Sequence, residues 1–290
     1  MLRLLLRVCI LNCCILSCCG FSCGEVSAQT LPQPTAEEIM QRVGQNQDRA
    51  EELRRQYVYK QRVRVASRKT SGKLMQEETS DYTVVPSPQG SNKTLTLLAG
   101  KYWKKHEYLT YSGQQTPNDG TLDGELVSDL RDDLANEKRS KDGIAANLFP
   151  LTSKEQQQYT FNFLGSETVN GRRSYRIGFR PKKNQDVVWK GEALIDAEEF
   201  QPVTIFTRLS RKVPFWVRTA LGTDLPDMGF SVTYKREPDG VWFPVSFGTE
   251  FRLRAVFLIN REITVSLQNS GFEKTHVDSV LHYEQSSLRP

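Results

Sequence analysis

The two-residue alternation of apolar and polar side chains after Tyr159 is the feature that most constrains this sequence. Such alternation is typical of β-strands with one face against a core and one face in water. The segments that show it are 159–164, 173–180, 186–196, 202–209, 230–235, 241–247, 251–259 and 261–270. Asn170-Gly171 and Asp239-Gly240 are hairpin turn signals. This half of the chain is therefore expected to be almost entirely β-strand.

The first half combines both periodicities. Apolar residues at helical spacing predict a helix from Thr35 to about Gln56, with Thr35 as its N-cap. Period-two strands are expected at 57–67, 75–85, 94–98 and 101–111, with turns at 71–72, 86–90 and 99–100. A second helix is expected from Glu125 to Lys138, with Leu126, Leu130 and Leu134 as its apolar stripe.

These elements predict a mainly β fold with a few helices. We expect a single antiparallel sheet of about ten strands or more, since hairpin turn signals connect strand segments. A sheet with that many twisted strands tends to curl. No linker or internal repeat is evident, so one domain is expected.

All six cysteines lie within the first 23 residues. Arg3 and Arg7 precede an apolar run, and small residues follow at 26–28, which is the order of a secretory signal peptide. We therefore expect a signal peptide at 1–28 and a mature, cysteine-free domain at 29–290 in the periplasm. A lipid anchor on Cys18, Cys19 or Cys23 is less favoured, because the residues before Cys18 and Cys23 match the lipobox pattern poorly.

The charge and the missing motifs exclude several classes of function. The formal net charge is only +5 and the charges are interspersed, which does not indicate a nucleic-acid partner. The sequence contains no HExxH, GxSxG, GxGxxG or P-loop motif. We therefore expect no enzyme, no cofactor and no metal, with an exported enzyme as the least favoured alternative.

The strand segments carry a large store of apolar and aromatic side chains that could share one concave face. The expected cavity-lining residues are Phe161, Phe163, Tyr175, Ile177, Phe179, Trp189, Ile195, Phe230, Val232, Phe243 and Phe257. Phe215 and Trp216 lie in a longer apolar connection, 213–227, that could form a short helix or a flap. The helices could fill this face completely. Alternatively, some of it could hold an acyl chain, since burying each CH₂ contributes roughly 0.8 kcal/mol.

Four local patterns resemble the periplasmic lipoprotein-carrier superfamily, the LolA/LolB-like proteins. The patterns are TAEEI at 35–39 leading to YVY at 57–59, GSETVNGRR at 165–173 followed by Tyr175 and the strand end 179–181, WKGEALID at 189–196 running on to Pro202, and VWFP at 241–244. Together they span nearly all of the mature chain.

The resemblance implies an open, curved antiparallel half-barrel closed by helices, with a hydrophobic cavity for acyl chains. It makes the helix 125–138, with Leu126, Leu130 and Leu134, a candidate lid. The function expected from it is a periplasmic carrier of lipid or of lipoprotein acyl chains, acting as a monomer. An envelope sensor or interaction module on the same fold, with an envelope protein partner, is the alternative.

Overall fold

The computed structural model describes residues 33–87, 90–116, 120–136, 149–183, 189–209, 223–224, 229–255 and 259–275. The chain divides into two units, Met1–Gln33 and Pro34–Pro290, and all of the described helices and strands belong to the second. The expected signal peptide, its cysteines, the flap residues Phe215 and Trp216, and Phe257 lie outside the described residues. The expectations for them stay predictions.

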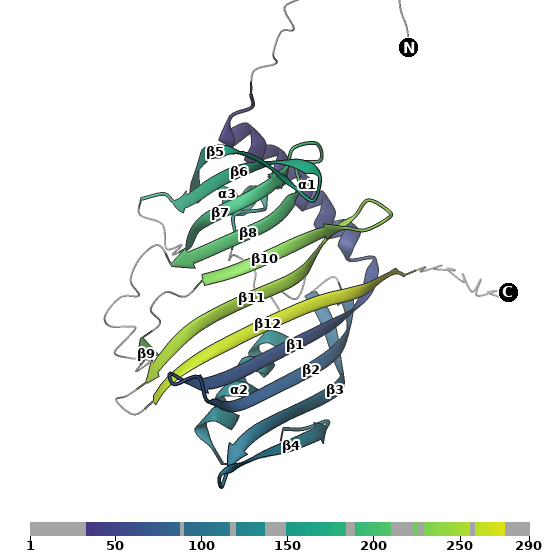
Figure 1. Cartoon of the computed structure of the whole chain (residues 1–290). Helices are drawn as coiled ribbons and strands as arrows, with labels where there is room; N and C mark the ends of the chain where they lie inside the picture. The colour runs from purple at the N-terminus through teal and green to yellow at the C-terminus, as the bar shows by residue number, and fades with distance from the viewer. Residues whose placement is uncertain are drawn as a thin grey trace, which may run out of the picture. The chain divides into compact units, whose positions relative to one another are not determined.

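The described elements are mostly strands (Figure 1). The helices are α1 (Ala36–Arg54), α2 (Leu122–Asn136) and α3 (Ser153–Gln156). The strands are β1 (Tyr57–Lys69), β2 (Leu74–Ser87), β3 (Gly90–Lys104), β4 (Glu107–Gly113), β5 (Tyr159–Val169), β6 (Arg172–Pro181), β7 (Trp189–Asp196), β8 (Pro202–Leu209), β9 (Thr223–Asp224), β10 (Gly229–Arg236), β11 (Trp242–Ala255) and β12 (Ile259–Lys274).

The described strands form one open antiparallel sheet. Its order is β4-β3-β2-β1-β12-β11-β10-β8-β7-β6-β5, and the short β9 pairs with β11. Pairing of β1 with β12 joins the first hairpins of the chain to the last one. The strands β4 and β5 are the two ends of this order, so the sheet does not close. The predicted mainly β fold, with a single antiparallel sheet and few helices, is confirmed.

The turn between β3 and β4 does not lie at the residues that the sequence predicts. A turn was expected at Ala99-Gly100, but both residues lie inside β3. The chain instead reverses at Lys105 and His106, which have φ values of 49° and 71°. Gly100 serves close packing, because a Cβ there would lie only 2.3 Å from the ring of Tyr111. The expected single strand 101–111 is therefore wrong.

The segments 241–247 and 251–259, expected as two strands, belong mostly to a single strand. Strand β11 runs unbroken through Gly248 and pairs with β12 from Ser246 to Ala255. By contrast, Asn170 and Gly171 both have positive φ, as the Asn-Gly hairpin signal predicts. Gly171 thus lies in a turn whereas Gly248 lies inside a strand, and the difference follows from which strands pair.

Both long helices cover the same sheet, each over a different region. α1 begins with a complete capping box, in which Thr35 and Glu38 satisfy each other's backbone N–H groups. Its residues Ile39, Met40 and Val43 are buried in the same core cluster as strand residues of β5–β8. α2 lies against β1, β2 and β3. It begins at Leu122, slightly before the predicted start, and its buried Val127 joins that core.

Candidate functional site

The candidate site is the helix-covered face of the sheet, which carries the alternating apolar residues of the strands. Cross-strand neighbours form continuous apolar rows; in one of these, Ile177 pairs with Ala193, and Ala193 with Ile205. The predicted lining residues Tyr175, Ile177, Phe179, Ile195 and Val232 are all buried in the main core cluster. They are core residues of the sheet, and whether any of them contacts a ligand stays a prediction.

Other predicted lining residues on this face are only partly buried. Phe161, Phe163 and Phe230 pack against the core but keep some exposure. Trp189 is also half-buried, and its ring lies edge-on to Phe230 with centroids 4.8 Å apart. Phe230 in turn stacks on the buried Phe247 at 5.3 Å. This aromatic row, Trp189-Phe230-Phe247, runs across β7, β10 and β11 from half-buried positions into the core.

Phe243 stands apart from the other predicted lining residues. It is buried, but its ring stacks on Phe272 at 4.1 Å and meets Tyr57 edge-on at 4.9 Å. A bulge opposite Tyr234 shifts the register between Phe247 and Phe243. Strict alternation along 241–247 therefore does not hold, and the main core cluster contains Trp242 and Phe247 but not Phe243.

The leucine stripe of α2 is only partly buried against the sheet. Val127 is completely buried, whereas Leu126, Leu130 and Leu134 remain half-buried beside the core. An amphipathic helix ordinarily buries its whole apolar stripe against its sheet. The three leucines and the aromatic row thus leave apolar surface that the described packing does not fill.

A buried carboxylate fixes α2 to the sheet. Arg131 of α2 donates a hydrogen bond to Glu78 of β2 at 2.8 Å, and the Glu78 side chain is only 1% exposed. Tyr111 and Thr116 each donate to the other Glu78 oxygen at 2.6 Å. Burial, and then the neighbouring Glu78 carboxylate, raise the pKa of Tyr111, so this phenol remains protonated as a donor.

A second ion pair holds the start of α2. The buried Asp123 accepts two hydrogen bonds from Arg261 of β12, at 2.7 and 2.9 Å, and one from Ser67 of β1 at 2.6 Å. The Asp123 partner raises the pKa of Arg261, against the opposing effect of its desolvation. Sequence reasoning missed Glu78, Asp123, Arg131 and Arg261. Gln76, Glu78 and Ser80, which alternate along β2 and are buried, were the available signal.

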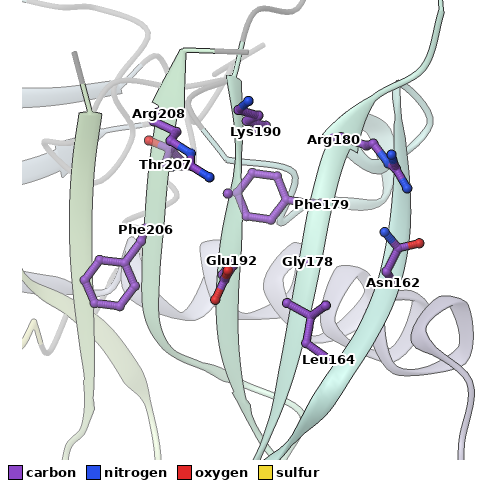
Figure 2. A pocket seen from close by; sticks show the side chains of 11 residues that line it. Asn162, Leu164, Gly178, Phe179, Arg180, Lys190, Glu192, Phe206, Thr207 and Arg208 are labelled. Atoms are coloured by element: carbon purple, nitrogen blue, oxygen red, sulfur yellow. The ribbon is translucent and has the colours of Figure 1, made fainter. Parts of the chain in front are cut away.

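The opposite, outer face of the sheet carries a groove of about 410 Å³ across β5–β8 (Figure 2). Its side chains come from the alternate strand positions, with α1 behind the strands in this view. They include Asn162, Leu164, Arg180, Lys190, Glu192, Phe206 and Arg208. The sequence analysis assigned no role to any of them.

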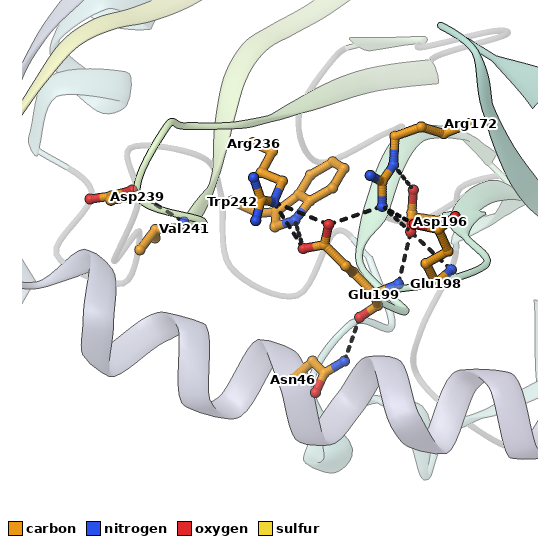
Figure 3. A network of polar contacts seen from close by, with 9 residues as sticks. All are labelled: Asn46, Arg172, Asp196, Glu198, Glu199, Arg236, Asp239, Val241 and Trp242. Carbon is orange, nitrogen blue, oxygen red and sulfur yellow. Dashed lines mark hydrogen bonds and ion pairs between the residues drawn. The ribbon is translucent and has the colours of Figure 1, made fainter.

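A polar network ties α1 to the turn between β7 and β8 (Figure 3). Asn46 of α1 donates to the backbone oxygen of Glu199 at 2.8 Å. The Glu199 carboxylate accepts from Trp242 Nε1 at 2.9 Å and from Arg172 at 2.9 Å. Arg172 also pairs with both oxygens of the buried Asp196, at 2.6 and 2.9 Å. The network positions α1 on the sheet.

The Asp196 carboxyl has a lowered pKa. Burial acts to raise it, but the Arg172 hydrogen bonds and the backbone N–H groups of Glu199 and Glu198 together outweigh burial. The group is therefore ionised in the folded protein at neutral pH. Its role is structural, because it joins Arg172, the first residue of β6, to the backbone of the turn that follows β7.

The described residues contain no group of three or more His, Cys, Asp or Glu residues arranged to hold a metal ion. Among the helices that the structure describes, none has the length and apolarity needed to span a membrane.

Comparison with known proteins returned solved structures only; no family model and no curated protein matches the chain. A LolA superfamily protein from Nitrosomonas europaea is 12% identical, with 84% of this chain and 96% of that chain covered and a TM-score of 0.36. A DUF1329 family protein from Desulfovibrio piger is 12% identical, covers 89% and 100%, and has a TM-score of 0.38.

A putative outer membrane lipoprotein-sorting protein domain from Vibrio parahaemolyticus is 11% identical, covers 88% and 95%, and has a TM-score of 0.39. A LolA superfamily protein is thus one of the solved structures to which the chain is similar.

Proposed function

We propose that this protein is a periplasmic carrier that binds the acyl chains of a lipid or lipoprotein on the helix-covered face of its sheet. The observation that carries the proposal is the unfilled apolar surface on that face. Leu126, Leu130 and Leu134 of α2, with Trp189 and Phe230 of the sheet, are half-buried although they adjoin the main core.

An acyl chain suits this surface on physical grounds. Each buried CH₂ contributes roughly 0.8 kcal/mol, so a chain needs only apolar contact and no directed polar group. The aromatic row 189-230-247 offers such contact from its half-buried end inward. The absence of catalytic motifs from the sequence is compatible with carriage, which requires no chemical step.

α2 is suited to act as the lid of the site. Its apolar stripe adjoins the core, and ion pairs fix it at two points, Arg131 with Glu78 and Asp123 with Arg261. Opening of this lid would expose less apolar area than a fully buried stripe would, because Val127 is completely buried but Leu126, Leu130 and Leu134 are only half-buried. A lid held in this way can leave the sheet at a lower cost than one held by a fully buried stripe.

The test uses native mass spectrometry and lipid extraction on protein purified gently from the envelope. We expect a bound lipid in the native protein and its loss in Phe230→Lys, which places a charge in the aromatic row. Leu97→Lys is the matched control, because Leu97 is 44% exposed and lies opposite Asp81 on the outer side of the sheet.

The proposal fails if the native protein is lipid-free and remains so after incubation with palmitoyl-oleoyl phosphatidylglycerol. It also fails if Leu97→Lys lowers lipid content as much as Phe230→Lys does. Subcellular fractionation tests the location separately, and recovery of the folded protein in the cytoplasm alone would oppose a periplasmic carrier.

A further inference from the structure

The outer-face groove of β5–β8 is shaped by a glycine at its floor and by two large apolar side chains along it. Gly178 gives it a floor without a side chain, because a Cβ at that position would lie 3.1 Å from Leu164 Cδ1. Leu164 and Phe206 lie along it and are 50% and 53% exposed. Single exposed apolar residues are common, but two large ones around one hollow form a surface that favours an apolar or interfacial contact.

One end of the groove is basic. Lys190 of β7 pairs directly with Arg208 of β8, which places like charges opposite each other across two strands. Arg180 lies beside them, because Phe179 pairs with Gly191 and Arg180 is the next residue along β6. Figure 2 shows the three cations at one end of the groove, with Phe206, Glu192 and Leu164 further along.

The three cations of the groove differ from several other arginines on the same face. Arg62 pairs with Asp81 at 2.7 Å, Arg252 pairs with Glu262 at 3.2 Å, and Arg64 pairs with Glu77. Among the ion pairs between described residues, none involves Lys190, Arg208 or Arg180, and the groove carboxylate Glu192 pairs instead with Arg176 at 2.7 Å. Like charges opposite each other in a sheet destabilise it, so an anion bound at this end would relieve a repulsion.

We propose that this groove docks the protein on an anionic phospholipid membrane. Arg180, Lys190 and Arg208 would contact lipid phosphates, while Phe206 and Leu164 enter the interfacial region. Basic residues next to an anionic membrane attract it additively, and apolar side chains between them add burial. The site lies on the face opposite the proposed acyl-chain site, so it does not depend on that function.

A membrane fits the groove better than an acidic peptide does. The three cations stand on β6, β7 and β8, which are paired on both sides within the sheet, so a peptide lying over them would have no free strand edge to extend; the free edge, on β5, lies at the margin of the groove. The groove offers cationic and apolar side chains to its occupant. Those are the groups that contact a lipid headgroup layer.

The test measures co-sedimentation of the chain from residue 29 onward, which retains the compact unit that starts at Pro34. The vesicles contain palmitoyl-oleoyl phosphatidylcholine with or without about 30% phosphatidylglycerol. We expect binding only with phosphatidylglycerol, and a loss of about fivefold in partitioning per cation removed, so about 100-fold in Arg180→Gln/Lys190→Gln/Arg208→Gln. Phe206→Ser should also weaken binding.

The matched control is Arg62→Gln/Arg64→Gln/Arg252→Gln, which removes the same charge from paired cations on the same face. Its partitioning should fall far less than that of the groove variant, with both variants folded by circular dichroism. Equal losses, or no binding of the unmodified protein, would overturn the proposal. Binding of polyglutamate in place of vesicles would overturn it in favour of an acidic protein partner.

Discussion

Arg131 of α2 donates to the Glu78 carboxylate of β2 at 2.8 Å, and that carboxylate is almost completely buried. The contact joins a helix to a strand that lies far earlier in the chain. A buried charge of this kind stabilises little in net terms, but it is costly to leave unpaired. Arg131 and Glu78 therefore fix where α2 sits on the sheet.

Arg131→Met should lower the free energy of unfolding by about 3–5 kcal/mol, because Glu78 would remain buried without its cation. Urea unfolding measures the change, and amide hydrogen exchange within α2 should become faster. Adding Glu78→Gln should recover most of the loss, since it removes the uncompensated charge. A loss below about 1 kcal/mol in the single variant would contradict this account of the contact.

Gly191→Ala should be among the most destabilising small substitutions in the sheet. A Cβ at Gly191 would lie 1.8 Å from the backbone oxygen of Phe206 and 2.9 Å from the Phe179 ring. Overpacking against a backbone atom cannot be relieved by a rotamer change, so we expect a loss of about 3 kcal/mol or more. Gly113→Ala is the control, because no atom lies within 4 Å of its new Cβ. Similar melting temperatures for the two variants would refute the prediction.

Asp196 should contribute stability that is lost at acidic pH. Its pKa is lowered in the folded state, so the stability is present above its unfolded value of 3.8 and is lost as the pH falls through the folded pKa. In Asp196→Asn, the free energy of unfolding should therefore fall less steeply as the pH decreases below about 4. Denaturant titrations at several pH values measure this. An unchanged acid limb in the variant would show that other carboxyls dominate.

Tyr57 should contribute stability that is lost at alkaline pH, the opposite of the dependence expected for Asp196. Burial and then the hydrogen bond to Asp239 raise the pKa of Tyr57 to about 12 from 10.0. Its contribution to stability is complete below about 10 and is lost as the pH rises through the folded pKa. Tyr57→Phe should be less stable than the native protein at about pH 8 and approach it above about pH 11. A stability gap that is constant across this range would rule out Tyr57 as the titrating group.

The sequence by itself determined the class of fold. Alternation with period two forces strands that bury one face, and the Asn170-Gly171 pair favours positive φ at both positions of a hairpin. The stripe of α1 likewise predicted its buried face, and Ile39 and Val43 are completely buried. These signals are local, because each depends only on residues a few positions apart.

Tertiary structure decided everything that depends on pairing between distant segments. The pairing of β1 with β12 cannot be predicted from the sequence of either strand alone. The bulge opposite Tyr234 likewise shifts the register at Phe243, which the local alternation does not predict. Glu78 and Arg131 look like ordinary surface residues in the sequence, and so do Lys190 and Arg208. Burial of the first pair and the repulsion within the second arise only when the sheet brings the strands together, because charge energetics depend on distance and solvent exposure rather than on sequence position.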